Sequence, residues 1–351
     1  MKIVLVIDHL KNGGAERVVS VLSNELIKMG HETHVIVTID ENNYALNKEV
    51  KYHVAEGMTN NKLIRRATRE YSLKKCINRI NPDVIYSFGY YMNLYSIFAC
   101  GDKYKLIISE RNDPERELNN SVLRAIRNML YGKCSLMVCQ TPQARDYYKK
   151  RINRPIVVIP NPISDALPDP WFGEREKKIV TACRLEPQKN LPMLIDAFKV
   201  IHEEYSDYKL IIYGDGSLKE ELYSKILKLG LEEYIRLPGF EKNIHEKILK
   251  SAMYVSSSDY EGISNSMLEA LAIGLPTICT DCPVGGAAMA IDDGINGVLV
   301  PVGNVNELYK AMKKVLDDKR FADSISKNAI CVRQKYNANK IAVEWVKLID
   351  Y

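Results

Sequence analysis

The sequence contains no long hydrophobic run. In 351 residues, no window approaches the roughly 18 uncharged apolar residues that a membrane-spanning helix needs. The first residues also lack the pattern of a signal peptide, because a single charge precedes a very short apolar run that ends at Ile7, and Asp8 follows directly. We therefore expect a protein that does not cross a bilayer and that is located in the cytoplasm.

A disulfide framework and a zinc pattern are also missing. The eight cysteines are scattered among apolar residues, as expected of reduced, buried thiols. Cys279 and Cys282 form a C-x-x-C, but a zinc site needs a second ligand pair at similar spacing, and the sequence has none. We expect both to be core or near-core thiols.

Acidic residues are scarce in the first half of the chain. Residues 1–165 contain 25 Lys and Arg against 17 Asp and Glu, whereas the remaining residues contain 24 against 27. This asymmetry favours an acidic partner on the N-terminal side, such as a diphosphate-bearing acceptor or an anionic membrane surface.

One stretch, residues 62–79, is rich in cations and contains one acid, Glu70. Its cations are Lys62, Arg65, Arg66, Arg69, Lys74, Lys75 and Arg79. Such a basic amphipathic helix can sit on an anionic membrane, where a polyprenyl-diphosphate-linked acceptor is found. It can equally pack on the N-terminal sheet with a solvated cationic face, and both interpretations stay open. Aromatic residues do not interleave with these charges, so we expect no nucleic-acid partner.

Apolar runs alternate with amphipathic stretches along the whole chain, which is typical of α/β domains with parallel sheets. The expected strands of the first half are 2–7, 32–38, 84–87, 106–109, 136–139 and 156–159. A stretch rich in Pro and Gly at 160–173 then interrupts the pattern and suggests an inter-domain linker. The expected strands of the second half are 179–182, 209–213, 234–237, 253–256, 277–279 and 297–300.

This pattern predicts two domains, 1–165 and 166–337. The tail from Asn304 to Tyr351 has no strand signal, and its apolar residues recur at helical spacing, so we expect two or three closing helices there.

Two loops after predicted strands are suited to bind an anion. Gly13 and Gly14 follow the first strand and open a helix, where paired glycines let a ligand approach the backbone. A tight turn without a ligand explains these glycines equally well. Arg184 and Lys189 lie at a strand end and before a helix, where both cations can converge on one phosphate pair. A solvated loop is the alternative.

The segment 258–270 offers groups for all three parts of a nucleotide sugar. Glu261, in the loop before a helix, can accept hydrogen bonds from sugar hydroxyls, and Glu269, in the second turn, can reach a ribose diol. The backbone at the helix start can bind phosphate oxygens. It comprises Gly262, Ile263, Ser264 and Asn265. An ordinary capped helix with two surface glutamates is the alternative.

Taken in order, these elements make the chain resemble the family 4 glycosyltransferases. The E-x7-E motif of that family is matched by Glu261 and Glu269, and its R-x4-K motif by Arg184 and Lys189. Its glycine-rich turn is matched by Gly214 and Gly216, its Gly-Gly loop by Gly13 and Gly14, and its loop beside the nucleobase by a segment that ends at Phe240. The resemblance spans nearly the whole chain.

The resemblance implies the GT-B fold. In that fold, two Rossmann-like, doubly wound domains face each other across a cleft, and the C-terminal helix crosses back to the N-terminal domain. The first domain, completed by about 338–351, would bind the acceptor, and the second would bind the nucleotide-sugar donor.

The resemblance also implies a retaining transfer without a metal. Arg184 and Lys189 would stabilise the charge on the leaving diphosphate. Glu261 would position the sugar, and a donor phosphate oxygen could accept the proton of the acceptor hydroxyl. The sequence agrees on the metal, since it has no D-x-D between strands. We expect no cofactor.

The acceptor side departs from the family pattern. Many relatives carry a His near the end of an N-domain strand, where this chain has Glu110 and Arg111. These two residues are candidates for acceptor contact, although an ion pair between Arg111 and Glu115 is equally compatible with the sequence.

The predicted function is transfer of a hexose or N-acetylhexosamine from a nucleoside-diphosphate sugar, with UDP the expected nucleotide, to a glycan or polyprenyl-diphosphate-linked glycan in polysaccharide assembly. Two alternatives are compatible with parts of the sequence. A GT-B-fold UDP-sugar 2-epimerase would need histidines near the sugar, and only His9 and His245 lie near predicted strand ends. A non-catalytic nucleotide-sugar-binding protein is the other. We expect a cytoplasmic enzyme with a possible peripheral position on the inner face of the membrane.

Overall fold

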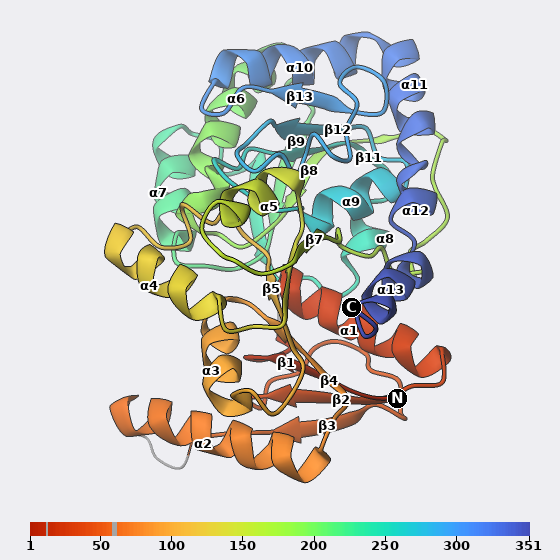
Figure 1. Cartoon of the computed structure of the whole chain (residues 1–351). Helices are drawn as coiled ribbons and strands as arrows, with labels where there is room; N and C mark the ends of the chain where they lie inside the picture. Colours follow the sequence, from red (N-terminus) through yellow and green to blue (C-terminus); the bar gives the residue numbers. More distant parts are fainter. Residues whose placement is uncertain (12, 58–61) are drawn as a thin grey trace. The chain divides into compact units, whose positions relative to one another are not determined.

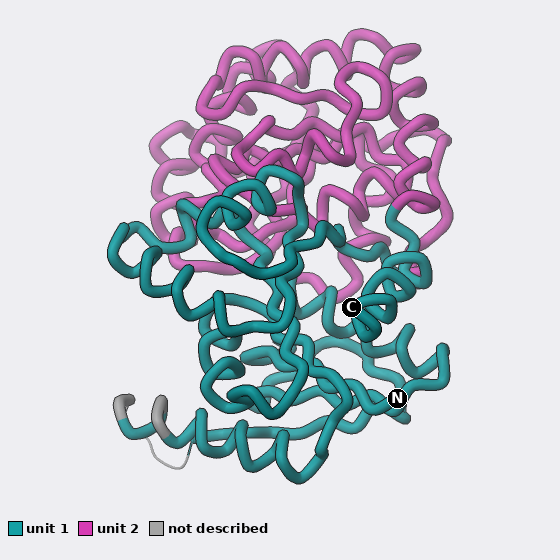
Figure 2. The backbone as a smooth tube through the Cα atoms, viewed as in Figure 1, with its two compact units in different colours: residues 1–164, 336–351 teal, residues 165–335 magenta. Residues whose placement is uncertain are grey.

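The structure, a computed structural model of the whole chain, describes residues 1–11, 13–57 and 62–351 (Figure 1). The chain folds into two compact units (Figure 2). Unit 1 comprises residues 1–164 and 336–351, and unit 2 comprises residues 165–335. The sequence-based boundaries lay at residues 165 and 337, and the acceptor-binding and donor-binding roles of the two units stay predictions.

Unit 1 contains a parallel sheet of seven strands in the order β3-β2-β1-β4-β5-β6-β7. Its strands are β1 (Lys2–Ile7), β2 (Glu32–Val37), β3 (Lys51–Val54), β4 (Val84–Phe88), β5 (Leu106–Glu110), β6 (Leu136–Cys139) and β7 (Ile156–Val158). Its helices are α1 (Gly14–Lys28), α2 (Lys62–Ile80), α3 (Tyr90–Cys100), α4 (Ser121–Tyr131), α5 (Pro142–Lys149) and α13 (Ala338–Lys347). The central strands are buried Val/Ile/Leu runs, as expected of a parallel sheet covered by helices.

The chain returns to unit 1 through α13, the last helix. Trp345 on this helix is fully buried and packs against Tyr86 and Phe88 of β4, with ring centres 5.0 and 5.3 Å away. The Tyr86 hydroxyl donates a hydrogen bond to the Trp345 carbonyl at 2.8 Å. The C-terminal helix therefore completes the core of the N-terminal unit, as the family resemblance implies.

Unit 2 contains a parallel sheet of six strands in the order β10-β9-β8-β11-β12-β13. Its strands are β8 (Glu176–Ala182), β9 (Lys209–Tyr213), β10 (Ile235–Gly239), β11 (Ser251–Ser256), β12 (Thr277–Thr280) and β13 (Val298–Val300). Its helices are the short 3-10 turn η1 (Pro187–Lys189) and α6 (Leu191–Glu204), α7 (Lys219–Lys228), α8 (Ile244–Ile248), α9 (Asn265–Ala272), α10 (Val305–Asp317), α11 (Lys319–Ala329) and α12 (Val332–Lys335).

Two expectations about elements need correction. Strand β3, a four-residue edge strand that pairs with β2, was not among the predicted strands. Two or three helices were predicted after Asn304, whereas residues 304–351, all of them described, form four. The additional helix is the single turn α12, which is too short to produce a helical periodicity of its own.

Cys279 and Cys282 are buried free thiols, as predicted. In the described part of the chain, no helix is both long and apolar enough to cross a membrane.

Candidate functional site

The candidate donor residues of unit 2 lie where two adjacent strands end. Strands β8 and β11 pair in parallel in the middle of the sheet, so their carboxyl ends open at the same edge. Arg184 and Lys189 follow β8, and Glu261 follows β11. In open α/β sheets this edge is where ligands bind.

Hydrogen bonds join the two loops. The Gln188 amide donates to the Tyr260 carbonyl at 2.8 Å, and the Asp259 N–H donates to the Gln188 carbonyl at 2.9 Å. The Asn190 amide donates to the Asp259 carboxylate at 2.7 Å, from a left-handed backbone conformation with φ of 42°. The same Asn190 side chain caps α6. These bonds fix the loop of the R-x4-K motif against the loop of the E-x7-E motif.

Lys189 and Glu261 form an ion pair between these loops. Their side chains are only 11% and 19% exposed, and the Ser258 hydroxyl donates a further, long hydrogen bond of 3.4 Å to Glu261. Burial by itself lowers the pKa of Lys189, but the Glu261 carboxylate together with Cys183 outweighs burial and raises this pKa above its ordinary value. Lys189 is therefore charged at neutral pH.

Arg184 is the exposed cation of the cluster. Its guanidinium forms no hydrogen bond or ion pair with the residues that the structure describes. Its positive charge repels that of nearby Lys189. The neighbouring acid, Glu186, is occupied instead by the backbone N–H and hydroxyl of Ser217, at 3.0 and 2.8 Å. These hydrogen bonds lower the pKa of Glu186. Arg184 is thus available to an anion.

The glycine-rich turn packs directly on the backbone after β8. A Cβ at Gly214, whose φ is 127°, would collide with the Cys183 carbonyl, and a Cβ at Gly216 would collide with the Leu185 backbone. Asp215, between them, accepts the N–H of Phe240 at 3.0 Å. The turn is therefore built for close backbone packing, which is a structural requirement for both glycines.

The loop before α9 contributes backbone groups. Ser264 is the N-cap of α9, and its hydroxyl accepts the Met267 N–H at 3.4 Å. Gly262 and Ile263 are buried, whereas the side chain of Phe240 is 48% exposed. Asn265, the first helical residue, is also buried.

The two glutamates of the E-x7-E motif have different partners. Glu269 is buried on α9 and lies 2.9 Å from the Nε2 of His245 on α8. Arg184, Lys189 and Glu261 therefore gather at the ends of β8 and β11, and Glu269 lies on the helix that follows, paired with a different residue.

Neither His245 nor Gly286 was among the predicted donor residues. A Cβ at Gly286 would collide with the Gly262 carbonyl, so the loop after β12 packs against the Glu261 loop. The Gly285-Gly286 pair, in the loop that follows β12, was a usable signal. The sequence showed His245 only as a histidine near a predicted strand end, and its contact with Glu269 depends on how α8 and α9 pack.

Two predicted donor residues belong to unit 1. Gly13 is the N-cap of α1, and Gly14 is its first residue. The Tyr44 hydroxyl donates to the Gly13 carbonyl at 2.9 Å and accepts its N–H at 3.2 Å. Tyr44 therefore holds this loop, and ligand binding by the glycines stays a prediction.

Glu110, at the end of β5, is buried in unit 1. It accepts the Tyr131 hydroxyl and, at 3.1 Å, the Asn93 amide. Burial, reinforced by the nearby Glu117 charge, raises the pKa of Glu110 to about 7.

Arg111 is held by other contacts. It donates to the Asn161 side chain at 3.0 Å and stacks between the rings of Phe88 and Trp345. Burial lowers its pKa to about 9. The alternative of an ion pair between Arg111 and Glu115 is therefore wrong, and acceptor contact by Glu110 and Arg111 stays a prediction.

The basic helix α2 packs on unit 1 through Leu73 and Ile77, which are buried. Arg65 lies 3.4 Å from Glu56. Arg69 lies 3.9 Å from Asp8. Lys62 and Arg66 were also predicted to contact a membrane, but their side chains lie outside the part of the chain that the structure describes.

Two family models together match nearly the whole chain. Residues 12–167 match the model described as Glycosyltransferase Family 4, and residues 168–331 match the model described as Glycosyl transferases group 1. These two ranges meet between residues 167 and 168, close to the boundary between the two units at residues 164 and 165.

Similar proteins cover the full length. An N-acetylgalactosamine-N,N'-diacetylbacillosaminyl-diphospho-undecaprenol 4-alpha-N-acetylgalactosaminyltransferase from Campylobacter jejuni is 27% identical, with 99% of both chains covered. A GalNAc-alpha-(1->4)-GalNAc-alpha-(1->3)-diNAcBac-PP-undecaprenol alpha-1,4-N-acetyl-D-galactosaminyltransferase from the same organism is 29% identical, with 99% of this chain and 98% of the other covered.

A solved structure has the same fold. HepE from Anabaena, in complex with UDP and glucose, aligns with a TM-score of 0.86 at 19% identity over 100% of this chain and 99% of the other. The fold is therefore GT-B, and the family match favours glycosyl transfer over the epimerase and the non-catalytic binding protein. On the match of both of its halves, the chain belongs to glycosyltransferase family 4.

Proposed function

We propose that this glycosyltransferase is a retaining, metal-independent enzyme that moves a hexose or N-acetylhexosamine from a UDP-sugar to a polyprenyl-diphosphate-linked glycan. The observation that carries the donor assignment is the cluster of Arg184, Lys189 and Glu261 at the ends of β8 and β11. The acceptor assignment is supported by the names of the two Campylobacter relatives, which both specify undecaprenol-linked acceptors.

In the proposed reaction, the acceptor hydroxyl attacks the anomeric carbon while the bond from that carbon to the diphosphate breaks. The bonding electrons leave with the diphosphate, whose growing charge Arg184 and Lys189 stabilise. The hydroxyl proton passes to a diphosphate oxygen on the same face, so the configuration is retained. Glu261 orients the sugar, and Glu269 accepts hydrogen bonds from the ribose.

The remaining donor contacts are assigned by position. The backbone at 262–265 would bind phosphate oxygens, and the exposed ring of Phe240 would contact the base. Donor binding by Gly13 and Gly14, at the start of α1, is a further part of the proposal. Among the described residues, no group of three or more His, Cys, Asp or Glu side chains is arranged to hold a metal. Two cations in the donor site supply positive charge that a metal would otherwise supply.

The test is a thermal-shift screen of the whole chain with UDP-, GDP- and ADP-sugars. We expect stabilisation by the UDP series alone, with full activity in EDTA. Arg184→Ala and Lys189→Ala should each abolish the shift. An unchanged shift in both variants would refute the donor site, and inactivation by EDTA that added Mg²⁺ or Mn²⁺ reverses would refute metal independence.

Contact of α2 with an anionic membrane, through Lys62, Arg65, Arg66 and Arg69, is a separate proposal. Its support is the cationic composition of the helix. The ion pairs of Arg65 and Arg69 reduce the charge that α2 has available for lipid.

A further inference from the structure

Helix α4 is amphipathic in the reverse of the usual sense. Its buried residues are polar: Arg127, Asn128 and Tyr131. Its apolar residues face outward instead. They are Val122, Leu123, Ile126 and Met129, which are 64%, 46%, 45% and 68% exposed. Three of them, at 122, 126 and 129, follow helical spacing along one side, and we call these four residues the α4 stripe.

The polar face of α4 is needed inside unit 1. The Tyr131 hydroxyl donates to buried Glu110, and Arg127 donates to the Tyr147 hydroxyl at 3.3 Å. The helix therefore cannot rotate to bury the stripe without leaving Glu110 unpartnered by Tyr131. A helix on a soluble protein normally turns its apolar side to the core, so this outward stripe indicates a surface that contacts something apolar.

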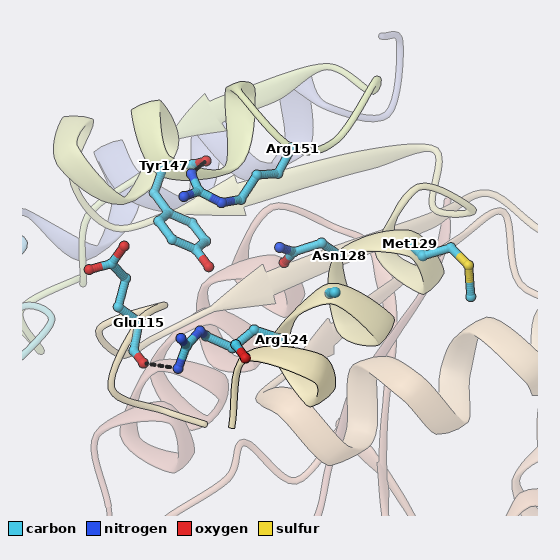
Figure 3. A pocket seen from close by; sticks show the side chains of 8 residues that line it. Glu115, Arg124, Asn128, Met129, Tyr147 and Arg151 are labelled. Carbon is cyan, nitrogen blue, oxygen red and sulfur yellow. Dashed lines mark hydrogen bonds between the residues drawn. The ribbon is translucent and has the colours of Figure 1, made fainter. Parts of the chain in front are cut away.

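A hollow of about 460 Å³ lies beside the stripe, between α4 and the end of α5 (Figure 3). Arg124 and Asn128 approach it from α4, and Tyr147 and Arg151 approach it from the other side. Met129, part of the stripe, also lines it, and so does Glu115, the one acidic residue of a lining that has two arginines.

The two arginines of the hollow are held in place. Arg124 donates to the carbonyls of Leu118 and Glu115, at 2.6 and 3.3 Å. The Arg151 guanidinium lies 3.8 Å from the centre of the Tyr147 ring. Both retain further N–H groups for an anion, since a guanidinium carries five.

The surrounding segment is strongly basic. Residues 111–154 contain ten Lys and Arg but four Asp and Glu, and the eight cations other than the buried Arg111 and Arg127 still outnumber these acids. Helix α4 itself contains two arginines and no acid. If a second copy of this chain met the first through the same face, the positive charges of the two faces would repel each other. An anionic bilayer instead offers phosphates to the arginines and an apolar layer to the stripe.

We propose that α4 docks this protein on an anionic lipid bilayer. The α4 stripe enters the boundary between headgroups and acyl chains, and the hollow with Arg124 and Arg151 takes the phosphate of a lipid headgroup. The proposal is independent of the sugar and the acceptor that the enzyme uses. It places the main lipid contact on α4, whereas α2 exposes two large apolar side chains among its described residues, Ile64 and Tyr71.

The test is co-sedimentation of the whole chain with vesicles of phosphatidylcholine, alone or mixed with phosphatidylglycerol. We expect binding to the mixed vesicles. The variant Val122→Ser/Ile126→Ser/Met129→Ser should bind these vesicles at least about tenfold more weakly than the wild type. The matched control is Ile64→Ser/Tyr71→Ser, which removes equally exposed apolar groups from the other basic helix and should bind within about twofold of wild type. Arg151→Gln should lose the preference for the anionic lipid.

Circular dichroism should show that all variants melt like the wild type, because the substituted side chains are exposed. The proposal is overturned if the triple variant sediments like the wild type, or if neutral and anionic vesicles bind equally. It is also overturned if soluble glycerol phosphate displaces the protein from vesicles, which would assign the hollow to a free phosphate. Light scattering that shows a dimer lost in the triple variant would assign the stripe to a second copy. The triple variant should still hydrolyse a UDP-sugar at the wild-type rate. This measurement distinguishes a loss of vesicle binding from a failure of the proposed transfer reaction.

Discussion

At the scale of the residue, Lys189 is neutralised by Glu261 before any donor binds. A diphosphate that enters the site must share Lys189 with this carboxylate. We therefore predict that Glu261→Gln retains the thermal shift with UDP but lowers turnover by about two to three orders of magnitude, the range that loss of one positioned active-site group produces. The neutral side chain also leaves Lys189 buried without its partner, which should lower the free energy of unfolding by about 2 kcal/mol.

Glu186→Gln is the matched control for this prediction. Glu186 lies in the same loop, but its partner is Ser217 rather than Lys189. Its substitution should leave turnover within about threefold of wild type. Wild-type turnover in Glu261→Gln, measured with saturating donor, would remove Glu261 from the catalytic assignment.

Glu110 makes the stability of unit 1 depend on pH. Its carboxyl has the ordinary pKa of 4.5 in the unfolded chain and a pKa of about 7 in the folded protein. Well below pH 4.5 both states hold the proton, so this group does not make the stability depend on pH there. As the pH rises from there to about 7, the unfolded state loses the proton first, and the folded state becomes progressively less stable.

The prediction is that Glu110→Gln becomes more stable than the wild type as the pH rises from 5 to about 8, because an amide keeps the hydrogen bonds of the protonated acid. Urea unfolding across this range measures the difference. Glu115→Gln removes an exposed carboxyl as the control. Parallel stability profiles for Glu110→Gln and the wild type would contradict the raised pKa.

At the scale of the element, the loop after β12 supports the Glu261 loop through Gly286. Gly286→Ala would drive a Cβ into the Gly262 carbonyl, so the backbone beside Glu261 must shift. We predict a loss of about 2 kcal/mol in unfolding free energy, as for an overpacked site, and loss of the UDP-induced shift.

The control for this substitution is Gly30→Ala. Gly30 also requires a glycine conformation, with φ of 83°, but an added Cβ there meets nothing within 4 Å. It should cost about 1 kcal/mol through the backbone alone and leave the UDP response intact. An intact UDP response in Gly286→Ala would show that the two loops are not coupled.

Which elements the sequence predicted depends on their burial. Central strands such as β1 and β4 are continuous apolar runs and were found within one residue of their observed ends. Strand β3, at the sheet edge, is only partly buried and contains Lys51 and His53, so its composition does not differ from that of a loop. His53 stacks on His34 of β2, and no local sequence pattern predicts this contact.

At the scale of the whole molecule, the candidate site depends on strand order. Lys189 and Glu261 lie 72 residues apart in the sequence and meet because β8 and β11 are neighbours in the sheet. The family motifs identified both residues and their strand ends in advance. The ion pair between them, the pairing of Glu269 with His245 and the contact of Gly286 with Gly262 depend on packing, which periodicity and motif spacing do not encode.

The two tryptophans of the chain report on the two units separately. Trp345 is buried in unit 1, whereas Trp171 lies in unit 2, where its indole N–H donates to the Glu174 carbonyl at 3.0 Å. The variant Trp345→Phe therefore carries a fluorescence probe in unit 2 alone, and Trp171→Phe carries one in unit 1 alone. Urea titration of each variant follows the unfolding of one unit.

If the donor site is the cluster around Arg184, UDP should stabilise unit 2 directly. At UDP concentrations about 100 times the dissociation constant, the gain is about 2.7 kcal/mol, which the Trp171 probe should record in full and the Trp345 probe to a smaller extent. Adding Arg184→Ala to each variant should remove the gain. A gain that the Trp345 probe reports while the Trp171 probe does not would place the nucleotide in unit 1, because a ligand stabilises the unit whose folded state it binds.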